Sequence, residues 1–127
     1  AAESLRQAIE SSYPGVAETV AMDDLDRVHE ISDQSDVILN LTGLGMGKFI
    51  GKMPFSDRIF HAGQLAFDAI YNPAETKFLE EAKKKGCAVL NGMSMNVYQG
   101  AIGFQFHTGR QAPIEQMRKT VERLLEN

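Results

Sequence analysis

The chain has 127 residues, 43% of them hydrophobic and 24% charged, which is the composition of a globular protein and the length of a single domain covering residues 1–127. The formal net charge of -4 argues against DNA, RNA or an anionic membrane as a partner, because each of these attracts a basic surface. No apolar run approaches the roughly 20 residues that span a bilayer. The N-terminus lacks a signal-peptide pattern and the chain has one cysteine, so we expect a cytoplasmic protein.

The first part of the chain is expected to form two helices and a short strand. Helix formers run from Ala2 to Ser12, where Tyr-Pro-Gly follows and stops the helix. Glu-Thr-Val-Ala-Met, residues 18–22, has the composition of a short strand. Asp23 or Asp24 then provides an N-cap for a helix that ends at about Ile31.

The rest of the chain alternates strands with helices. Val37–Leu41 is a continuous apolar run, typical of a strand buried on both faces of a parallel sheet. Further strands are expected at Gln64–Asn72 and Cys87–Asn91, and further helices at Ala74–Lys85, from Met93 to about His107, and from Ile114 onward. In the helix that follows Pro73, the pattern directs Phe78, Leu79 and Ala82 inward and leaves the lysines of residues 83–85 as a solvated end before Gly86.

The single cysteine and the histidines do not indicate a reactive or metal site. Cys87 lies in an apolar strand-like run, which favours a buried structural thiol over a nucleophile. His29, His61 and His107 lack metal-ligand spacing and have no cysteine or acidic cluster beside them. We therefore expect no metal site.

The stretch Val-Ile-Leu-Asn-Leu-Thr-Gly-Leu-Gly-Met-Gly-Lys-Phe-Ile-Gly, residues 37–51, places glycines and a lysine after a strand, as a phosphate-binding loop does. The Walker pattern fails because Thr42 stands where its first glycine belongs and Phe49 follows Lys48. The dinucleotide fingerprint also fails, because Lys48 occupies the place of the third glycine. A flexible connection after a buried strand is the simpler interpretation.

Alternating strands and helices with short connections predict a parallel α/β sheet with right-handed crossovers. Such sheets bind ligands at the carboxyl ends of their strands. Three segments follow strands at this edge: Thr42–Gly47, Asp68–Pro73 and Asn91–Gln99. We expect them to form one site.

These three segments resemble motifs of the shikimate dehydrogenase family. Asn-Leu-Thr-Gly-Leu-Gly-Met, residues 40–46, is similar to the family's Asn-Ala-Thr-Pro-Leu-Gly-Met turn, with Gly43 where proline is usual. Residues 67–86, with Asp-Ala-Ile-Tyr-Asn-Pro-Ala-Glu-Thr, resemble its Asp-x-x-Tyr-Asn-Pro-x-x-Thr segment. Residues 91–109 resemble its Gly-x-x-Met-Leu-x-x-Gln segment, with Asn96 in place of the usual leucine. The resemblance spans about residues 37–109.

The resemblance implies a fold and a site. The fold would be a partial Rossmann-like α/β domain, a parallel sheet flanked by helices that lacks the first two strands of the full domain. The backbone at Ala69 and Gly92 would face the nicotinamide of NADP, with Thr42 and Met46 nearby. Tyr71 and Gln99 match the substrate-facing tyrosine and glutamine, although a tyrosine and a glutamine without this context are more often structural. Turn-organising roles are the better interpretation for three other residues of the motif, Asp68, Asn72 and Thr76.

Other parts of the family's machinery have no counterpart in these residues. Family members carry an N-terminal substrate domain with a lysine and an aspartate that handle the substrate hydroxyl, and a glycine-rich loop opening the cofactor domain. Neither is present, so no catalytic residue is assigned and we expect the isolated chain, as a C-terminal fragment, to be inactive. In the strand order 3-2-1-4-5-6 the missing strands leave Val37–Leu41 as an uncovered apolar edge, which favours self-association.

Several alternatives remain open at the level of sequence. The resemblance implies that the chain is part of a longer parent enzyme that interconverts shikimate and 3-dehydroshikimate with NADP(H). The substrate of this parent enzyme could instead be quinate. A natural stand-alone module that has lost catalysis and serves interaction or regulation is a different class of function, which Gly43 and Asn96 slightly favour. The loop that would distinguish NAD from NADP lies outside the matched motifs.

Overall fold

The computed structural model describes residues 2–125 and is built around a three-stranded parallel sheet. Strand β1 (Val37–Asn40) pairs with β2 (Leu65–Asp68), which pairs with β3 (Ala88–Asn91), so that the spatial order is β1-β2-β3. This arrangement confirms the predicted parallel α/β sheet and leaves β1 at one edge.

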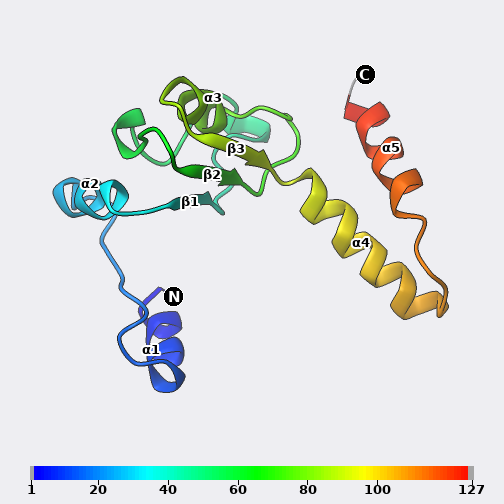
Figure 1. Cartoon of the computed structure of the whole chain (residues 1–127), viewed down its shortest axis with the longest axis horizontal. Helices are drawn as coiled ribbons and strands as arrows, with labels where there is room; N and C mark the ends of the chain where they lie inside the picture. The colour runs from blue at the N-terminus through cyan, green and yellow to red at the C-terminus, as the bar shows by residue number, and fades with distance from the viewer. Residues whose placement is uncertain (1, 126–127) are drawn as a thin grey trace.

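Five helices accompany the sheet (Figure 1). They are α1 (Ala2–Ser12), α2 (Leu25–Asp33), α3 (Lys77–Lys84), α4 (Met93–Thr108) and α5 (Ile114–Leu125), and single 3-10 turns lie at Gly47–Phe49 and Asp57–Ile59. Helix α3 lies against the sheet, α1 stands apart from it, and α4 and α5 form a hairpin that projects beyond β3 (Figure 1). None of the helices within residues 2–125 combines the length and apolar character needed to cross a membrane.

The hydrophobic core lies between α3 and one face of the sheet. Phe78, Leu79 and Ala82 of α3 are buried, as the helical pattern predicts, and Phe78 packs edge-to-face on Phe60 with ring centroids 5.0 Å apart. Ala66 in the central strand is fully buried beneath them. The other buried members of this cluster are Ile59 and Cys87.

The opposite face of the sheet is apolar and uncovered. The register aligns Leu39, Phe67 and Leu90 across the three strands, so their side chains share this face. Leu39 is 55% exposed and Leu90 48%, and Val37 on the same face is 49% exposed. The expectation that β1 is buried on both faces is therefore wrong. Helices cover only one side, because α4 leaves the sheet instead of folding back across it (Figure 1).

Three predicted elements differ from the structure. The strand expected at Gln64–Asn72 ends at Asp68, and residues 69–72 belong to the following loop. Residues 18–22 form no strand, because they find no neighbouring strand to accept their backbone hydrogen bonds. Helix α3 begins at Lys77 and not at Ala74, because Thr76 is its N-cap: its hydroxyl accepts a hydrogen bond from the Leu79 backbone N–H at 3.4 Å. Pro73 lies in the preceding loop.

Other local predictions are confirmed. Asp24 caps α2, with its carboxylate accepting a hydrogen bond from the Arg27 backbone N–H. Burial raises the pKa of the Cys87 thiol, which donates to the His61 carbonyl oxygen at 3.3 Å and is structural. The lysines at the end of α3 are exposed and paired with acids, Lys83 with Glu75, Lys84 with Glu80 and Glu81, and Lys85 with Asp57.

Candidate functional site

Three buried polar side chains meet at the carboxyl ends of β1 and β2. Asn40 ends β1, Asp68 ends β2 and Thr76 precedes α3, and none is more than 2% exposed. Asp68 Oδ2 accepts hydrogen bonds from Asn40 Nδ2 at 3.2 Å and Thr76 Oγ1 at 2.6 Å, while Oδ1 accepts from the Ile70 backbone N–H at 3.0 Å. This polar cluster ties two strands to α3, which confirms the structural roles expected of Asp68 and Thr76.

The turn after β1 is held by the same asparagine. Asn40 Oδ1 accepts hydrogen bonds from the Thr42 backbone N–H at 3.1 Å and from Thr42 Oγ1 at 2.7 Å. The Leu44 backbone N–H in turn donates to Thr42 Oγ1 at 3.1 Å. Gly45 follows with a φ of +119°, and a Cβ there would lie 3.2 Å from the Ile70 side chain. The glycine therefore lets the turn lie close over the end of β2.

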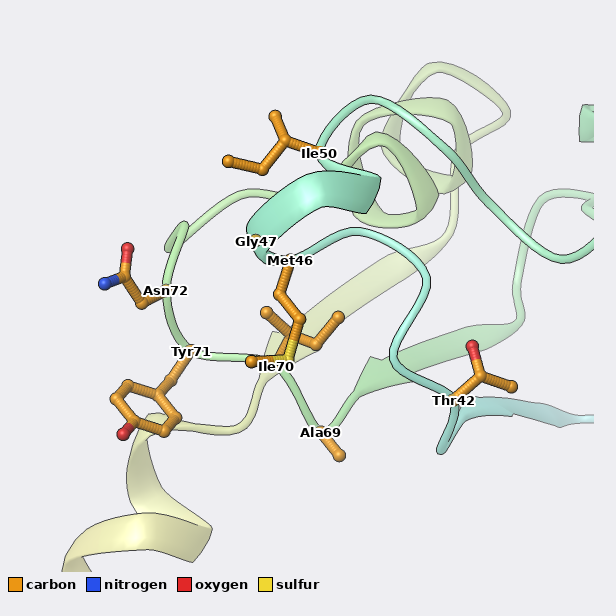
Figure 2. Close-up of a pocket in the computed structure, with 8 residues that line it drawn as sticks. All are labelled: Thr42, Met46, Gly47, Ile50, Ala69, Ile70, Tyr71 and Asn72. Atoms are coloured by element: carbon orange, nitrogen blue, oxygen red, sulfur yellow. The ribbon is translucent and has the colours of Figure 1, made fainter.

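A pocket of about 510 Å³ opens at this edge of the sheet (Figure 2). Two segments line it, the turn after β1 and the loop after β2; the lining residues are Thr42, Met46, Gly47, Ile50, Ala69, Ile70, Tyr71 and Asn72. Four of the residues predicted for a site, Thr42, Met46, Ala69 and Tyr71, are thus brought together at one place. Their side chains come from segments that are separated by more than 20 residues in sequence.

Gly92 lies directly behind the Ala69 backbone. Its N–H donates a hydrogen bond to the Ile70 carbonyl oxygen at 3.0 Å. A Cβ at position 92 would overlap the Ala69 carbonyl oxygen and come 3.1 Å from Ala69 Cα, so only glycine allows this approach. Gly92 therefore sets the position of one wall of the pocket without being a lining residue.

Of the two residues with predicted substrate roles, Tyr71 lines the pocket and Gln99 does not. Tyr71 is 36% exposed and its ring lies at the pocket, on the side where α4 begins (Figure 2). Gln99 is exposed in the second turn of α4 and does not line the pocket. The Gln99 side chain on α4 is therefore accessible from solvent.

The lining of the pocket is mainly apolar, with three polar residues. Apolar side chains dominate it, and Thr42, Tyr71 and Asn72 add a hydroxyl, a phenol and an amide. Among residues 2–125, no aspartate, glutamate, histidine or lysine lines this pocket. The pocket is therefore suited to hold and orient a molecule.

Sequence reasoning missed some of the lining. The sequence predicts only a turn-organising role for Asn72, and the structure shows that it also lines the pocket. Gly47, Ile50 and Ile70 line the pocket as well, and no motif distinguishes them. Ile50 is brought there by the 3-10 turn at Gly47–Phe49, a local geometry that residue patterns do not predict.

Comparison with protein families gives one match, to the family described as Shikimate 5'-dehydrogenase C-terminal domain, at residues 92–122. These residues make up most of the α4–α5 hairpin. The chain is also similar to curated proteins beyond that segment. A shikimate dehydrogenase (NADP(+)) of Dehalococcoides mccartyi is 37% identical over 114 residues, which is 90% of this chain and 40% of that protein. The chain spans about two fifths of the length of this relative.

Solved structures share the fold. A shikimate 5-dehydrogenase from Listeria monocytogenes, in complex with shikimate and NAD, matches 94% of this chain and 42% of its own with a TM-score of 0.87 and 28% identity. A quinate dehydrogenase from Corynebacterium glutamicum, in complex with NAD, matches 96% of this chain and 42% of its own with a TM-score of 0.82 and 25% identity. The three-stranded sheet and its helices therefore have the arrangement found in these dehydrogenases.

Proposed function

This chain belongs to the shikimate dehydrogenase family, and we propose that it forms the nicotinamide-binding part of an oxidoreductase that interconverts shikimate and 3-dehydroshikimate with NADP(H). The observation that carries the proposal is the pocket at the carboxyl ends of β1 and β2, where Thr42, Met46, Ala69 and Tyr71 meet. In parallel α/β sheets this edge is where ligands bind. NADP is favoured as the cofactor because it is named for the relative in Dehalococcoides mccartyi.

The residues present fit the nicotinamide end of such a cofactor. Gly92 and Gly45 bring backbone segments together where a Cβ would intrude, which leaves a wall of peptide groups beside the pocket. In the proposed arrangement the backbone at Ala69 and Gly92 faces the ring, and Thr42 and Met46 flank it. The cofactor, when bound, supplies or accepts the hydride. The chain's own contribution is to hold the ring in one orientation and keep water from its face.

Tyr71 and Gln99 are proposed to bind the substrate. The Tyr71 phenol lies at the pocket, where it can donate a hydrogen bond to a carboxylate or hydroxyl of a ring acid. Gln99 is exposed on α4, with an amide that offers both a donor and an acceptor. The first turns of α4 would carry this amide beside the substrate.

We propose that the chain alone does not catalyse the reaction. Oxidising a hydroxyl-bearing carbon requires removal of the hydroxyl proton, and no aspartate, glutamate, histidine or lysine lines the pocket within residues 2–125. The chain also spans only about 40% of the relative in Dehalococcoides mccartyi, which supports a role as the C-terminal part of a longer enzyme. Such an enzyme would work in the cytoplasm, where the single buried Cys87 stays reduced.

The test uses isotope-labelled protein and two-dimensional NMR. We expect NADP+ to shift the backbone amides of Met46, Ala69 and Gly92, and shikimate to shift resonances around Tyr71. Tyr71→Phe should weaken the shikimate response, whereas Tyr13→Phe, at an exposed tyrosine outside the pocket, should leave it unchanged. The wild-type chain should form no NADPH from shikimate. An absence of cofactor shifts would overturn the cofactor role, and NADPH formation that Gln99→Ala abolishes would overturn the proposed inactivity.

Two alternatives have a specific observation in their favour. The likeness to a quinate dehydrogenase favours quinate as the substrate of the longer enzyme, and quinate-induced shifts at Tyr71 larger than those of shikimate would support it. Gly43 and Asn96, which depart from the family pattern, favour a non-catalytic module. Such a module need not bind a cofactor, so the NADP+ titration separates it from the enzyme.

We also propose that the chain self-associates. Strand β1 is an edge strand of the sheet, and its Val37 and Leu39 side chains are about half exposed. Unpaired backbone groups beside apolar side chains recruit another strand. A second copy of β1 offers the same groups.

A further inference from the structure

Asp68 is a buried acid that the proposed function leaves unused. Its side chain is fully buried at the end of the central strand β2. Both carboxylate oxygens accept hydrogen bonds, Oδ1 from the Ile70 backbone N–H and Oδ2 from Asn40 Nδ2 and Thr76 Oγ1. The amide and the backbone N–H can only donate, so both oxygens of the Asp68 carboxylate act as acceptors here.

The charge of Asp68 has no cationic partner in the part of the chain that the structure describes. None of the ion pairs there includes it, and its three partners are neutral groups. Hydrogen bonds satisfy its oxygens but do not cancel its charge. A net negative charge therefore remains inside the protein at this position.

This charge lies immediately behind the pocket. Asp68 precedes Ala69 and holds the Ile70 N–H, and both of these neighbours line the pocket. Through Asn40 it is also linked to Thr42, which lines the pocket from the other side. The pocket lining contains no charged side chain within residues 2–125. Lys48, which follows the lining residue Gly47, is exposed, whereas the Asp68 carboxylate next to Ala69 is fully buried.

We propose that Asp68 sets the preference of the pocket for the oxidised cofactor over the reduced one. The inference rests on the proposed function, in which the nicotinamide ring occupies this pocket. The oxidised ring carries a positive charge and the reduced ring is neutral, so a nearby negative charge stabilises only the oxidised form. The ratio of the affinities for the two forms changes only through interactions that one form makes and the other lacks. Asp68 is thus a specificity-determining residue that acts through space.

The expected size of the effect follows from Coulomb's law. Two opposite unit charges roughly 8 Å apart, at an effective dielectric constant of about 20, favour the charged ligand by about thirtyfold. Solvent at the pocket mouth screens part of this, and we expect a change of about tenfold in the ratio of the two affinities. Without the charge, an apolar pocket should prefer the neutral reduced ring, because desolvating a charge is unfavourable.

The test compares oxidised and reduced nicotinamide mononucleotide, which present the ring without the adenosine half of the cofactor. Dissociation constants are measured by NMR titration of the 127-residue chain. The wild type should bind the oxidised form more tightly. Asp68→Asn, with its fold checked by circular dichroism, should lower the ratio of oxidised to reduced affinity about tenfold. The matched control is Asp33→Asn, which removes an exposed carboxylate paired with Arg58 just before the start of β1, at the other end of the strands.

The outcomes separate the inference from the proposed function. Equal or tighter binding of the reduced form by the wild type would overturn the inference whether or not Asp68→Asn folds. A folded Asp68→Asn variant with an unchanged ratio would also overturn it, and both results leave the cofactor site standing. No binding of either form by the wild type would overturn the proposed nicotinamide site together with the inference. A merely structural role for Asp68 would weaken both forms equally and leave the ratio unchanged.

Discussion

At the scale of single residues, glycines define the pocket as much as the side chains do. Gly92 and Gly103 both belong to the region of α4, yet their surroundings are opposite. A Cβ at position 92 would overlap the Ala69 backbone, whereas a Cβ at position 103 would meet nothing within 4 Å. Because Gly92 has a φ of −76°, which any residue adopts, the restriction there is steric and comes from the pocket wall.

This contrast gives a paired prediction. Gly92→Ala should destabilise the protein by about 1–3 kcal/mol, because the Ala69 backbone or the start of α4 must move to admit the methyl group. Gly103→Ala should stabilise it by about 0.5–1 kcal/mol, because alanine has the higher helix propensity and the site is open. Urea unfolding followed by circular dichroism measures both. A Gly92→Ala variant as stable as the wild type would show that the Ala69 backbone moves to admit the methyl group with no loss of free energy of unfolding.

Most of the site residues that the resemblance predicts also line the pocket. The reason is that the family's motifs lie in the same chain segments that form the pocket. Thr42, Met46, Ala69 and Tyr71 lie within the matched segments and line the pocket. Ile50 lies outside them, and the 3-10 turn at Gly47–Phe49 that brings it to the pocket is a local geometry that residue patterns do not predict. The sequence did not predict that Asn40, Asp68 and Thr76 are in contact, since their hydrogen bonds join positions up to 28 residues apart.

At the scale of elements, prediction succeeded where local signals mark the ends of a segment, as the left-handed Gly109 does for α4, and failed where a segment depends on a neighbouring strand. Helix α4 has the expected bounds to within one residue, α5 begins at the expected Ile114, and β3 lies where it was expected. Residues 18–22 have strand composition but no strand beside them, so their backbone stays irregular. Residue composition shows that a segment can form a strand, but the strand forms only where a neighbouring strand pairs with it.

Helix α1 illustrates the same dependence and supports a prediction about exchange. None of its described residues is buried, and it stands apart from the sheet (Figure 1). Its contacts are local, such as the Gly15 and Ala17 backbone N–H groups donating to Glu10 at 2.8 Å. A helix of this length without tertiary packing is marginal in water. We therefore expect α1 amides to exchange with deuterium far faster than those of α3, which buries three residues. Equal protection of the two helices, measured by NMR, would contradict this.

At the scale of the whole molecule, the sheet is covered on one face only. Helix α3 and the core occupy one side, while Val37, Leu39, Phe67 and Leu90 lie on the other. This uncovered face continues to the unpaired edge of β1. Monomeric proteins rarely expose contiguous apolar surface next to an open strand edge, because the combination promotes association.

Self-association is therefore the prediction that belongs to the molecule as a whole. Light scattering should give a mass above that of the monomer at micromolar concentration, since two copies of β1 can pair and bury their half-exposed leucines. Leu39→Lys should return the mass to that of the monomer, because a charge on the edge strand of this face cannot be buried without a partner. Leu5→Lys, which places the same charge on an exposed leucine of α1, should leave the mass unchanged. A wild-type chain that is monomeric at every concentration would show that the uncovered face does not recruit a second copy. Repulsion between the net charges of -4 on each chain would then be tested by repeating the measurement at a higher salt concentration.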